Sequence, residues 1–221
     1  MKNDFAIFMP GRLNSERLPG KLLLPVGDTN LWEIACKRLN DLNLPVSKYV
    51  LVCDKELIKV AKKFPNLTII KRDPKTVKID GPLTEIYKDI KPKKEKYFMF
   101  LNPCLPFVSQ EAIIKSINTF RMYKLEYASS VKKFQNWIFD VQGKPITPID
   151  EKKLSTKDIH AWEAANLFHI FNKDEFFKTG KMLDLTKLAC LAIPREEADD
   201  VDTPEDMEYV RFKYEILHRH R

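Results

Sequence analysis

The sequence is poor in the features that mark membrane-spanning, secreted or disordered chains. No window of 18 or more apolar residues occurs, so no transmembrane helix is expected. Glycine- or serine-rich tracts are nearly absent, and 44% of the residues are hydrophobic, which favours a fully folded chain. Asp4 lies within the first few residues, a poor match to a signal peptide. We therefore expect a cytoplasmic protein with no membrane partner.

Paired cysteines and two common phosphate-binding motifs are also missing. The four cysteines form no C-x-x-C pair, so we expect reduced core or pocket residues rather than zinc ligands or disulfides. Neither a G-x-x-x-x-G-K-[ST] loop nor a G-x-G-x-x-G fingerprint occurs. The net charge of +7 would suit an anionic partner. The lysines are spread along the chain, however, and the densest run, 91–96, is expected to be a solvated loop, so no nucleic-acid site is predicted.

What the sequence does contain is a basic loop directly behind an apolar run. Residues 5–9 predict a buried first strand, and residues 10–21 follow with two glycines, two prolines, two arginines and a lysine. Glycine lets a backbone approach a ligand closely, and proline lowers the entropy lost when the loop is ordered. Arginine, lysine and serine supply the donors that phosphate oxygens accept. The candidate anion-binding residues are Pro10, Gly11, Arg12, Ser15, Arg17 and Lys21. A basic surface turn is the alternative.

The rest of the chain alternates apolar strands with helices. We predict strands at 49–53, 67–70, 97–101, 126–131, 164–171 and 188–193, helices at about 30–43, 55–64, 83–90, 109–123 and 204–217, and a hairpin turn at 141–144. The predicted helix N-caps are Asn30, Asp54, Ser109 and Thr203. The alternation indicates an α/β fold with a mainly parallel sheet and right-handed crossovers. Ligands in such sheets bind beyond the carboxyl ends of the strands, where the basic loop lies.

A second motif, residues 199–208, is strongly acidic. Thr203 and Asp206 match a helix start with a capping box, so the helix alone explains them. Asp200 and Asp202 are not explained in this way. One residue separates them, so in an extended segment their side chains point to the same side, and adjacent like charges are costly unless a cation joins them. Farther along, the last helix is expected to bury an apolar side formed by Tyr209, Phe212, Ile216 and Leu217.

Both motifs resemble those of a known family. The pattern Pro10-x-Arg12-x-x-Ser15-x-Arg17-Leu18-Pro19-Gly20-Lys21 is similar to the N-terminal signature of the cytidylyltransferases that activate 3-deoxy-manno-octulosonate (Kdo) and sialic acids. The acidic motif resembles their Asp-x-Asp-T-P-E-D signature. The resemblance implies a single domain, 1–221, with the three-layer, mainly parallel mixed sheet of the nucleotide-diphospho-sugar-transferase (GT-A-like, Rossmann-like) fold. It also implies transfer of CMP from CTP to an acidic sugar, with release of pyrophosphate, for surface polysaccharide synthesis.

The resemblance also assigns roles to residues. Lys21, Arg12 and Asp202 would be catalytic, and Asp200 with Asp202 would bind Mg²⁺. The nucleotide would be held by Pro10, Gly11, Arg12, Ser15, Arg17, Lys21, Arg72 and Asn102. An insertion at about 132–172 would reach over the acceptor and pair two subunits into a homodimer. From the residues alone, a surface arginine in a polar turn remains open for Arg72, and a loop-capping asparagine for Asn102.

The chain departs from the Kdo enzymes after the strand at 97–101. The segment 102–106 is similar to the Q-P-T-S-P of sialic acid synthetases and takes the place of G-D-E-P in the Kdo enzymes, so Cys104 stands where those enzymes have a metal-binding Asp. A neutral thiol is a poor ligand for Mg²⁺. Residues 164–171 resemble the families' N-G-x-x-Y-x-F strand, in which His169 is expected to be half-buried rather than a catalytic base. Nearby, either acceptor-lining or packing roles stay open for Trp162 and Glu163.

The sequence leaves the acceptor and the general base undetermined. A related nucleotidyltransferase acting on a non-sugar phosphate, a phosphonate or a different sugar is one alternative. A catalytically silent nucleotide-binding homologue is another, although an intact basic loop and Asp-x-Asp pair disfavour it.

Overall fold

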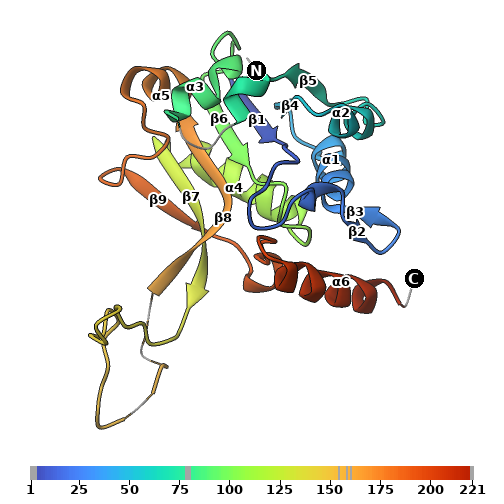
Figure 1. Ribbon diagram of the computed structural model, residues 1–221. Helices are drawn as coiled ribbons and strands as arrows, with labels where there is room; N and C mark the ends of the chain where they lie inside the picture. The colour runs from blue at the N-terminus through green and yellow to red at the C-terminus, as the bar shows by residue number, and fades with distance from the viewer. Residues whose placement is uncertain (1–3, 78–80, 154, 158, 160, 220–221) are drawn as a thin grey trace.

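The computed structural model describes residues 4–77, 81–153, 155–157, 159 and 161–219. Its centre is a seven-stranded sheet in the order β5-β4-β1-β6-β8-β7-β9 (Figure 1). The strands are β1 (Phe5–Pro10), β4 (Ser47–Val52), β5 (Thr68–Lys71), β6 (Tyr97–Leu101), β7 (Tyr127–Phe134), β8 (Ala161–Asn172) and β9 (Leu188–Ala192). Neighbouring strands are parallel except that β8 runs antiparallel to both β6 and β7. The mainly parallel, mixed sheet expected from the sequence is therefore confirmed.

Helices cover both faces of this sheet and give three layers. One apolar cluster packs the sheet against α1 (Leu31–Asp41), α2 (Lys55–Ala61), α4 (Gln110–Met122) and α6 (Pro204–His218). A second cluster lies on the other face, with α5 (Lys173–Thr179) and the 3-10 turn η3 (Lys88–Ile90). The side chains of β1 from Phe5 to Met9 are fully buried, because a central parallel strand is covered on both faces. None of the helices in the described ranges combines the length with the apolar composition that a bilayer crossing requires.

Three of the four predicted N-caps make the expected hydrogen bond. The Asn30 side chain accepts from a backbone N–H at the start of α1, and Ser109 does the same for α4. Thr203 and Asp206 form the predicted capping box of α6. Asp54 occupies the N-cap position of α2, but its side chain makes no capping hydrogen bond. The start of α2 therefore lacks the capping contact that its sequence predicts.

The outer face of α6 corrects another prediction. Tyr209, Phe212, Ile216 and Leu217 were expected in the core, yet they are between 47% and 61% exposed. Met207 and Val210 are the residues of α6 that are buried, at most 2% exposed, and Tyr214 is partly buried against the same core cluster. Their spacing of three and four residues places them on one narrow side of the helix. The expected apolar side faces away from the core.

Smaller departures affect element boundaries. The helix predicted at 83–90 is a short α3 (Leu83–Ile86) followed by η3, and α5 was not predicted. Residues 22–30 include a two-stranded hairpin of β2 (Pro25–Val26) and β3 (Thr29–Asn30). Further 3-10 turns are η1 (Lys21–Leu23), η2 (Pro74–Val77) and η4 (Arg195–Glu197).

Between β7 and β8 the chain projects away from the sheet (Figure 1). An isolated antiparallel bridge joins Phe139 to Pro145, and the backbone N–H of Asp140 donates to the Lys144 carbonyl at 2.8 Å. The predicted hairpin turn at 141–144 is therefore confirmed, with Gly143 at a φ of +83° that favours glycine. The expected insertion at 132–172 contains this projection, and a few of its residues lie outside the described ranges.

Candidate active site

A cavity of about 460 Å³ opens at the carboxyl ends of β1, β5 and β6. This is the edge at which ligands of parallel α/β sheets bind. Every predicted nucleotide-binding residue contributes to its wall, as does Asp202, whereas Asp200 lies outside the lining. The lining residues are Pro10, Gly11, Arg12, Ser15, Glu16, Arg17, Lys21, Leu22, Arg72, Val77, Leu83, Ile86, Tyr87, Phe100, Asn102, Pro103, Cys104 and Asp202. The basic loop is therefore part of a cavity and not a surface turn.

Close backbone packing sets the path of the basic loop. The Gly11 N–H donates to the Leu51 carbonyl at 2.9 Å, which keeps the loop beside β4. A Cβ atom on Gly11 would meet two ring carbons of the buried Trp32 at 2.9 Å. Gly20 has a φ of +70°, just before η1 delivers Lys21 to the cavity. The two glycines thus serve tight packing at one end of the loop and a left-handed backbone at the other.

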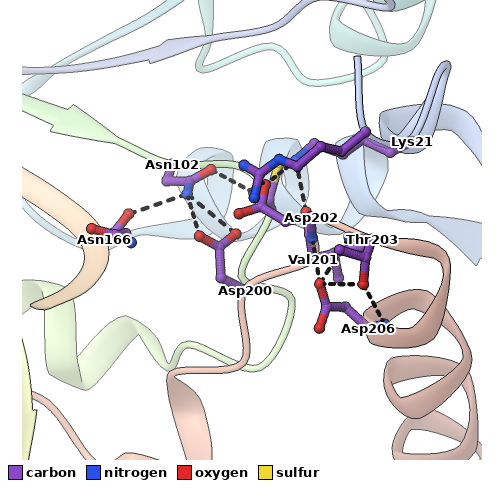
Figure 2. A network of polar contacts seen from close by, with 10 residues as sticks. Lys21, Asn102, Asn166, Asp200, Val201, Asp202, Thr203 and Asp206 are labelled. Atoms are coloured by element: carbon purple, nitrogen blue, oxygen red, sulfur yellow. Dashed lines mark hydrogen bonds and ion pairs between the residues drawn. The ribbon is translucent and has the colours of Figure 1, made fainter. Parts of the chain in front are cut away.

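Lys21 joins the basic loop to the acidic motif. Its Nζ donates to the Val201 carbonyl at 2.7 Å and to Asp202 Oδ1 at 2.9 Å (Figure 2). Arg17 Nη2 lies 2.8 Å from the same carboxylate oxygen, although its side chain is largely exposed. Burial by itself would lower the pKa of Lys21, but the hydrogen bond to Asp202 and the charges of Asp202 and Asp200 raise it above its ordinary value. Lys21 is therefore a firmly protonated ammonium group.

Asp200 lies beside this ion pair in a different setting. Its carboxylate accepts from Asn102 Nδ2 at 3.3 and 3.4 Å, and the same amide donates to the Asn166 carbonyl at 3.1 Å (Figure 2). Burial, followed by the charge of Asp202, raises the pKa of Asp200 to about 6. The two carboxylates therefore repel each other electrostatically, as their spacing in the sequence predicts.

Asn102 combines the two roles that the sequence left open. Its Oδ1 accepts from the Cys104 N–H at 3.0 Å, which is the loop-capping contact, and its side chain also lines the cavity. The adjoining strand provides Asn166, whose φ of +52° is uncommon for a residue other than glycine. The segment after β6 is therefore tied to both β8 and the acidic motif.

The first turn of α6 fixes the backbone of Asp202 through hydrogen bonds to Asp206. Asp206 Oδ2 accepts from the backbone N–H of Asp202 at 3.0 Å and from the N–H and hydroxyl of Thr203 at 2.8 and 2.9 Å. Burial would raise the pKa of Asp206, but these donors lower it below its usual range. The capping box thus fixes the backbone that carries Asp202 as well as the helix start.

Arg72 and Arg12 approach the cavity from another wall. Arg72 is only 6% exposed, so the surface alternative for it is wrong. Its guanidinium donates to Thr76, and Arg12 Nη1 donates to the Val77 carbonyl at 3.3 Å. The guanidinium of Arg72 also lies 5.6 Å from the ring centre of Tyr87. Two cations held in one cavity wall favour an anionic ligand.

Cys104 closes the cavity floor as a neutral thiol. It is 6% exposed, and burial raises its pKa to about 12. All four cysteines are free, as predicted, although Cys190 is exposed rather than in the core or a pocket. In the described residues, no group of three or more His, Cys, Asp and Glu side chains is arranged to hold a metal ion.

The sequence did not single out the apolar part of the wall. Val77, Leu83, Ile86, Tyr87 and Phe100 all line the cavity. Nothing in their local sequence separates a cavity-lining apolar residue from a core residue, because both occur in apolar strands and short helices.

Three residues considered for other roles lie elsewhere. Trp162 and Glu163 are exposed on β8 and do not line the cavity. His169 is half-buried, as predicted, with its Nδ1 3.0 Å from the Ser129 hydroxyl. Its ring stacks on that of Phe100, a cavity-lining residue, with 5.8 Å between the ring centres, and His169 itself does not line the cavity.

Comparison with known proteins points to one family. The cytidylyltransferase family model matches residues 6–158. The 3-deoxy-manno-octulosonate cytidylyltransferases of Rickettsia bellii strains OSU 85-389 and RML369-C are each 27% identical over 150 residues. That alignment covers 67% of this chain and 61% of theirs, so the chain spans less than two thirds of these curated relatives.

Solved structures share the fold over almost the whole chain. A CMP:2-keto-3-deoxy-manno-octonic acid synthetase complexed with CTP aligns with 98% of this chain and 99% of its own, at a TM-score of 0.70 and 13% identity. A 4-diphosphocytidyl-2C-methyl-D-erythritol synthase from Anaerococcus prevotii aligns with 95% of this chain and 94% of its own, at a TM-score of 0.66 and 13% identity. A cytidylyltransferase from Leptospira borgpetersenii aligns with 94% of this chain and 85% of its own, at a TM-score of 0.61 and 18% identity. The predicted nucleotide-diphospho-sugar-transferase fold is confirmed.

Proposed function

The chain belongs to the cytidylyltransferase family, and from this premise we propose that it transfers CMP from CTP to an acidic sugar. The acceptor class is a 2-keto-3-deoxy acid, Kdo-like or sialic-acid-like, and the product serves surface polysaccharide synthesis in the cytoplasm. An acceptor hydroxyl oxygen attacks the α-phosphorus of CTP, a new P–O bond forms, and the bond to pyrophosphate breaks. The hydroxyl proton passes to solvent or to a general base, to which we assign no residue.

The contact between Lys21 and Asp202 carries this proposal. It brings the basic loop and the acidic motif to one cavity. Phosphoryl transfer places most of its demands on positioning and on neutralising charge. Arg12, Arg17 and Lys21 are the donors that would cradle the triphosphate, and Arg17 and Lys21 both pair with Asp202 of the acidic motif. Lys21 would stabilise the charge that develops at the reacting phosphate.

The donor set fits a divalent cation. Asp200 and Asp202 offer the oxygen ligands that Mg²⁺ prefers, and Mg²⁺ commonly binds through one or two carboxylates together with substrate phosphates. Burial and then the charge of Asp202 raise the pKa of Asp200, and a cation held between the two carboxylates would offset their repulsion. When bound, Mg²⁺ would neutralise phosphate charge. The neutral Cys104 is not part of this donor set.

A homodimer is part of the proposal, with the projection between β7 and β8 as its contact. Ile138, Phe139 and Ile146 are exposed on this projection, and Trp162 is exposed at the adjoining start of β8. Burial of such side chains against a second copy is favourable. Light scattering on the purified protein should give twice the monomer mass. A monomer at micromolar concentration would contradict the proposed homodimer.

Two measurements test the proposed reaction. Thermal melting with CTP, UTP, GTP and ATP in the presence of Mg²⁺ should show the largest stabilisation with CTP, since a ligand of the native state raises the melting temperature. Pyrophosphate release from CTP should then depend on an acidic sugar. CTP turnover with a polyol phosphate alone would favour another nucleotidyltransferase, and tight CTP binding without turnover would favour a silent homologue.

A further inference from the structure

Arg38, on α1, is a buried cation outside the cavity lining. It is 7% exposed, and its Nη1 donates to the carbonyls of Leu105 at 2.7 Å and Val108 at 3.0 Å. Burial lowers the pKa of Arg38 to about 10, although the charge of Glu197 acts to raise it, so the guanidinium stays protonated at neutral pH. Among the residues that the structure describes, Arg38 Nε and Nη2 are buried without a hydrogen-bond partner. A buried charge with unpaired donors is costly, and the contacts to the two carbonyls must offset that cost.

The two carbonyls belong to the segment 102–109, which joins β6 to α4 outside any helix or strand. Pro103 and Pro106 within it lack a backbone N–H. Leu105 and Val108 are at most 4% exposed, and a buried carbonyl outside a helix or sheet needs a donor from elsewhere. Arg38 supplies that donor to both, and it thereby fixes the path of the second half of the segment.

The first half of the same segment forms part of the cavity wall, through Asn102, Pro103 and Cys104. The Asn102 amide donates to the Asp200 carboxylate at 3.3 and 3.4 Å (Figure 2). The Cys104 carbonyl accepts from the Val201 N–H at 3.1 Å. A shift of the segment would therefore displace Asp200 and Val201 as well.

A further contact joins the end of the segment to the chain ahead of the acidic motif. Glu197 Oε2, in η4, accepts from the Ser109 N–H at 2.9 Å and from its hydroxyl at 3.0 Å. Residues 102–109 and 197–201 are thus linked at both ends by hydrogen bonds. Arg38 attaches this linked pair of segments to α1.

We propose that Arg38 is a positioning residue that, through the backbone of residues 105–108, sets the places of Asn102 and Asp200 at the proposed Mg²⁺ site. The inference rests on the proposed function and adds a residue that acts from outside the cavity. Groups that orient metal ligands without touching the metal are typically worth roughly 10- to 100-fold in metal affinity or activity.

The chain offers a matched control in a second buried cation. Lys173 is also 7% exposed, and its Nζ donates to the Lys93 carbonyl, in the loop before β6. Arg38→Met and Lys173→Met each remove a buried charge that binds a loop carbonyl, but only the first loop lines the cavity. Mn²⁺ titrated into the protein with CTP, without acceptor, and followed by electron paramagnetic resonance gives the metal affinity. Calorimetric titration with CTP in EDTA gives the nucleotide affinity, and melting curves verify folding.

Arg38→Met should bind Mn²⁺ about tenfold more weakly than the wild type. Its affinity for CTP in EDTA should stay within about twofold, because the basic loop keeps its own contacts, and kcat should fall about tenfold with little change in KM for CTP. Arg38→Lys keeps the charge but not the fork of donors and should lose about threefold in Mn²⁺ affinity. Lys173→Met should match the wild type in Mn²⁺ affinity and kcat. On an Asn102→Ala background, Arg38→Met should have no further effect on Mn²⁺ binding.

Unchanged Mn²⁺ affinity in both Arg38 variants, or in Arg38→Lys alone should Arg38→Met not fold, would overturn the inference. Equal losses in Arg38→Met and Lys173→Met would also overturn it, because they would indicate a general effect of stability. A wild-type protein that binds neither CTP nor Mn²⁺ would instead refute the proposed function, so the two failures are distinguishable.

Discussion

The ammonium group of Lys21 lies 2.9 Å from the carboxylate of Asp202, although 181 positions separate them in the sequence. Lys21 is delivered by η1 behind β1, and Asp202 by the extended segment ahead of α6. Both side chains line the cavity, so the pair links the two ends of the chain at one point.

Removing either member of the pair should slow catalysis. Lys21→Ala or Asp202→Asn should lower turnover by at least ~10²-fold, the loss measured for single electrostatic donors at other active sites. Pyrophosphate release with CTP and the correct acceptor measures the effect. Lys37→Ala, which breaks an exposed pair with Asp41, is the matched control and should leave turnover unchanged. Near-normal rates in both site variants would remove the proposed mechanism.

Substitution of Gly11 should damage both stability and binding. In Gly11→Ala the new methyl group would meet the fully buried Trp32 ring at 2.9 Å, which should cost about 1–3 kcal/mol of unfolding free energy and displace the loop. Urea unfolding and CTP titration measure the two effects. Gly81→Ala has open space around its Cβ position and should be close to neutral. Equal stability of the two variants would contradict the packing described.

The two sides of α6 should respond differently to truncation. Met207→Ala removes a side chain that is 2% exposed and should cost about 2–5 kcal/mol. Phe212→Ala removes one that is 61% exposed and should cost less than about 0.5 kcal/mol. Chemical denaturation of the two variants provides the comparison. A large loss in Phe212→Ala would show that the outer face is covered in solution.

Acidification should destabilise the protein through His169. Burial lowers the pKa of His169 below its ordinary value of 6.5. The unfolded chain therefore takes up a proton near pH 6.5 while the folded protein does not. The stability due to neutral His169 is present in full above that pH and is lost as the pH falls towards the folded pKa. Melting temperatures between pH 7.5 and 5.5 should fall more steeply for the wild type than for His169→Gln. Parallel slopes would contradict this account.

Local signals in the sequence accounted for much of the fold and the cavity. The apolar run at 5–9 and the Asn30, Ser109 and Thr203 caps are determined by residues within a few positions of one another. The position of the basic loop followed from a general rule for parallel sheets. These features need no knowledge of distant contacts, and the structure confirms them.

The failures concern information that is absent from local sequence. Phe212 has the apolar character of a core residue, but only the placement of α6 against the sheet decides that Met207 faces inward. Tyr87 lies between two short helical turns, and its contact with Arg72 depends on the tertiary packing of that segment. The local pattern of side chains does not determine such tertiary contacts.

The carboxylate of Asp206 performs two tasks at once, because it begins α6 and also holds the backbone of Asp202. The folding of the first turn of α6 and the position of the Asp202 backbone are therefore coupled. A substitution that unwinds the first turn of that helix would reach the chemistry without altering any side chain that meets a substrate. Efforts to stabilise or shorten the carboxyl-terminal end should treat this turn as part of the proposed active site.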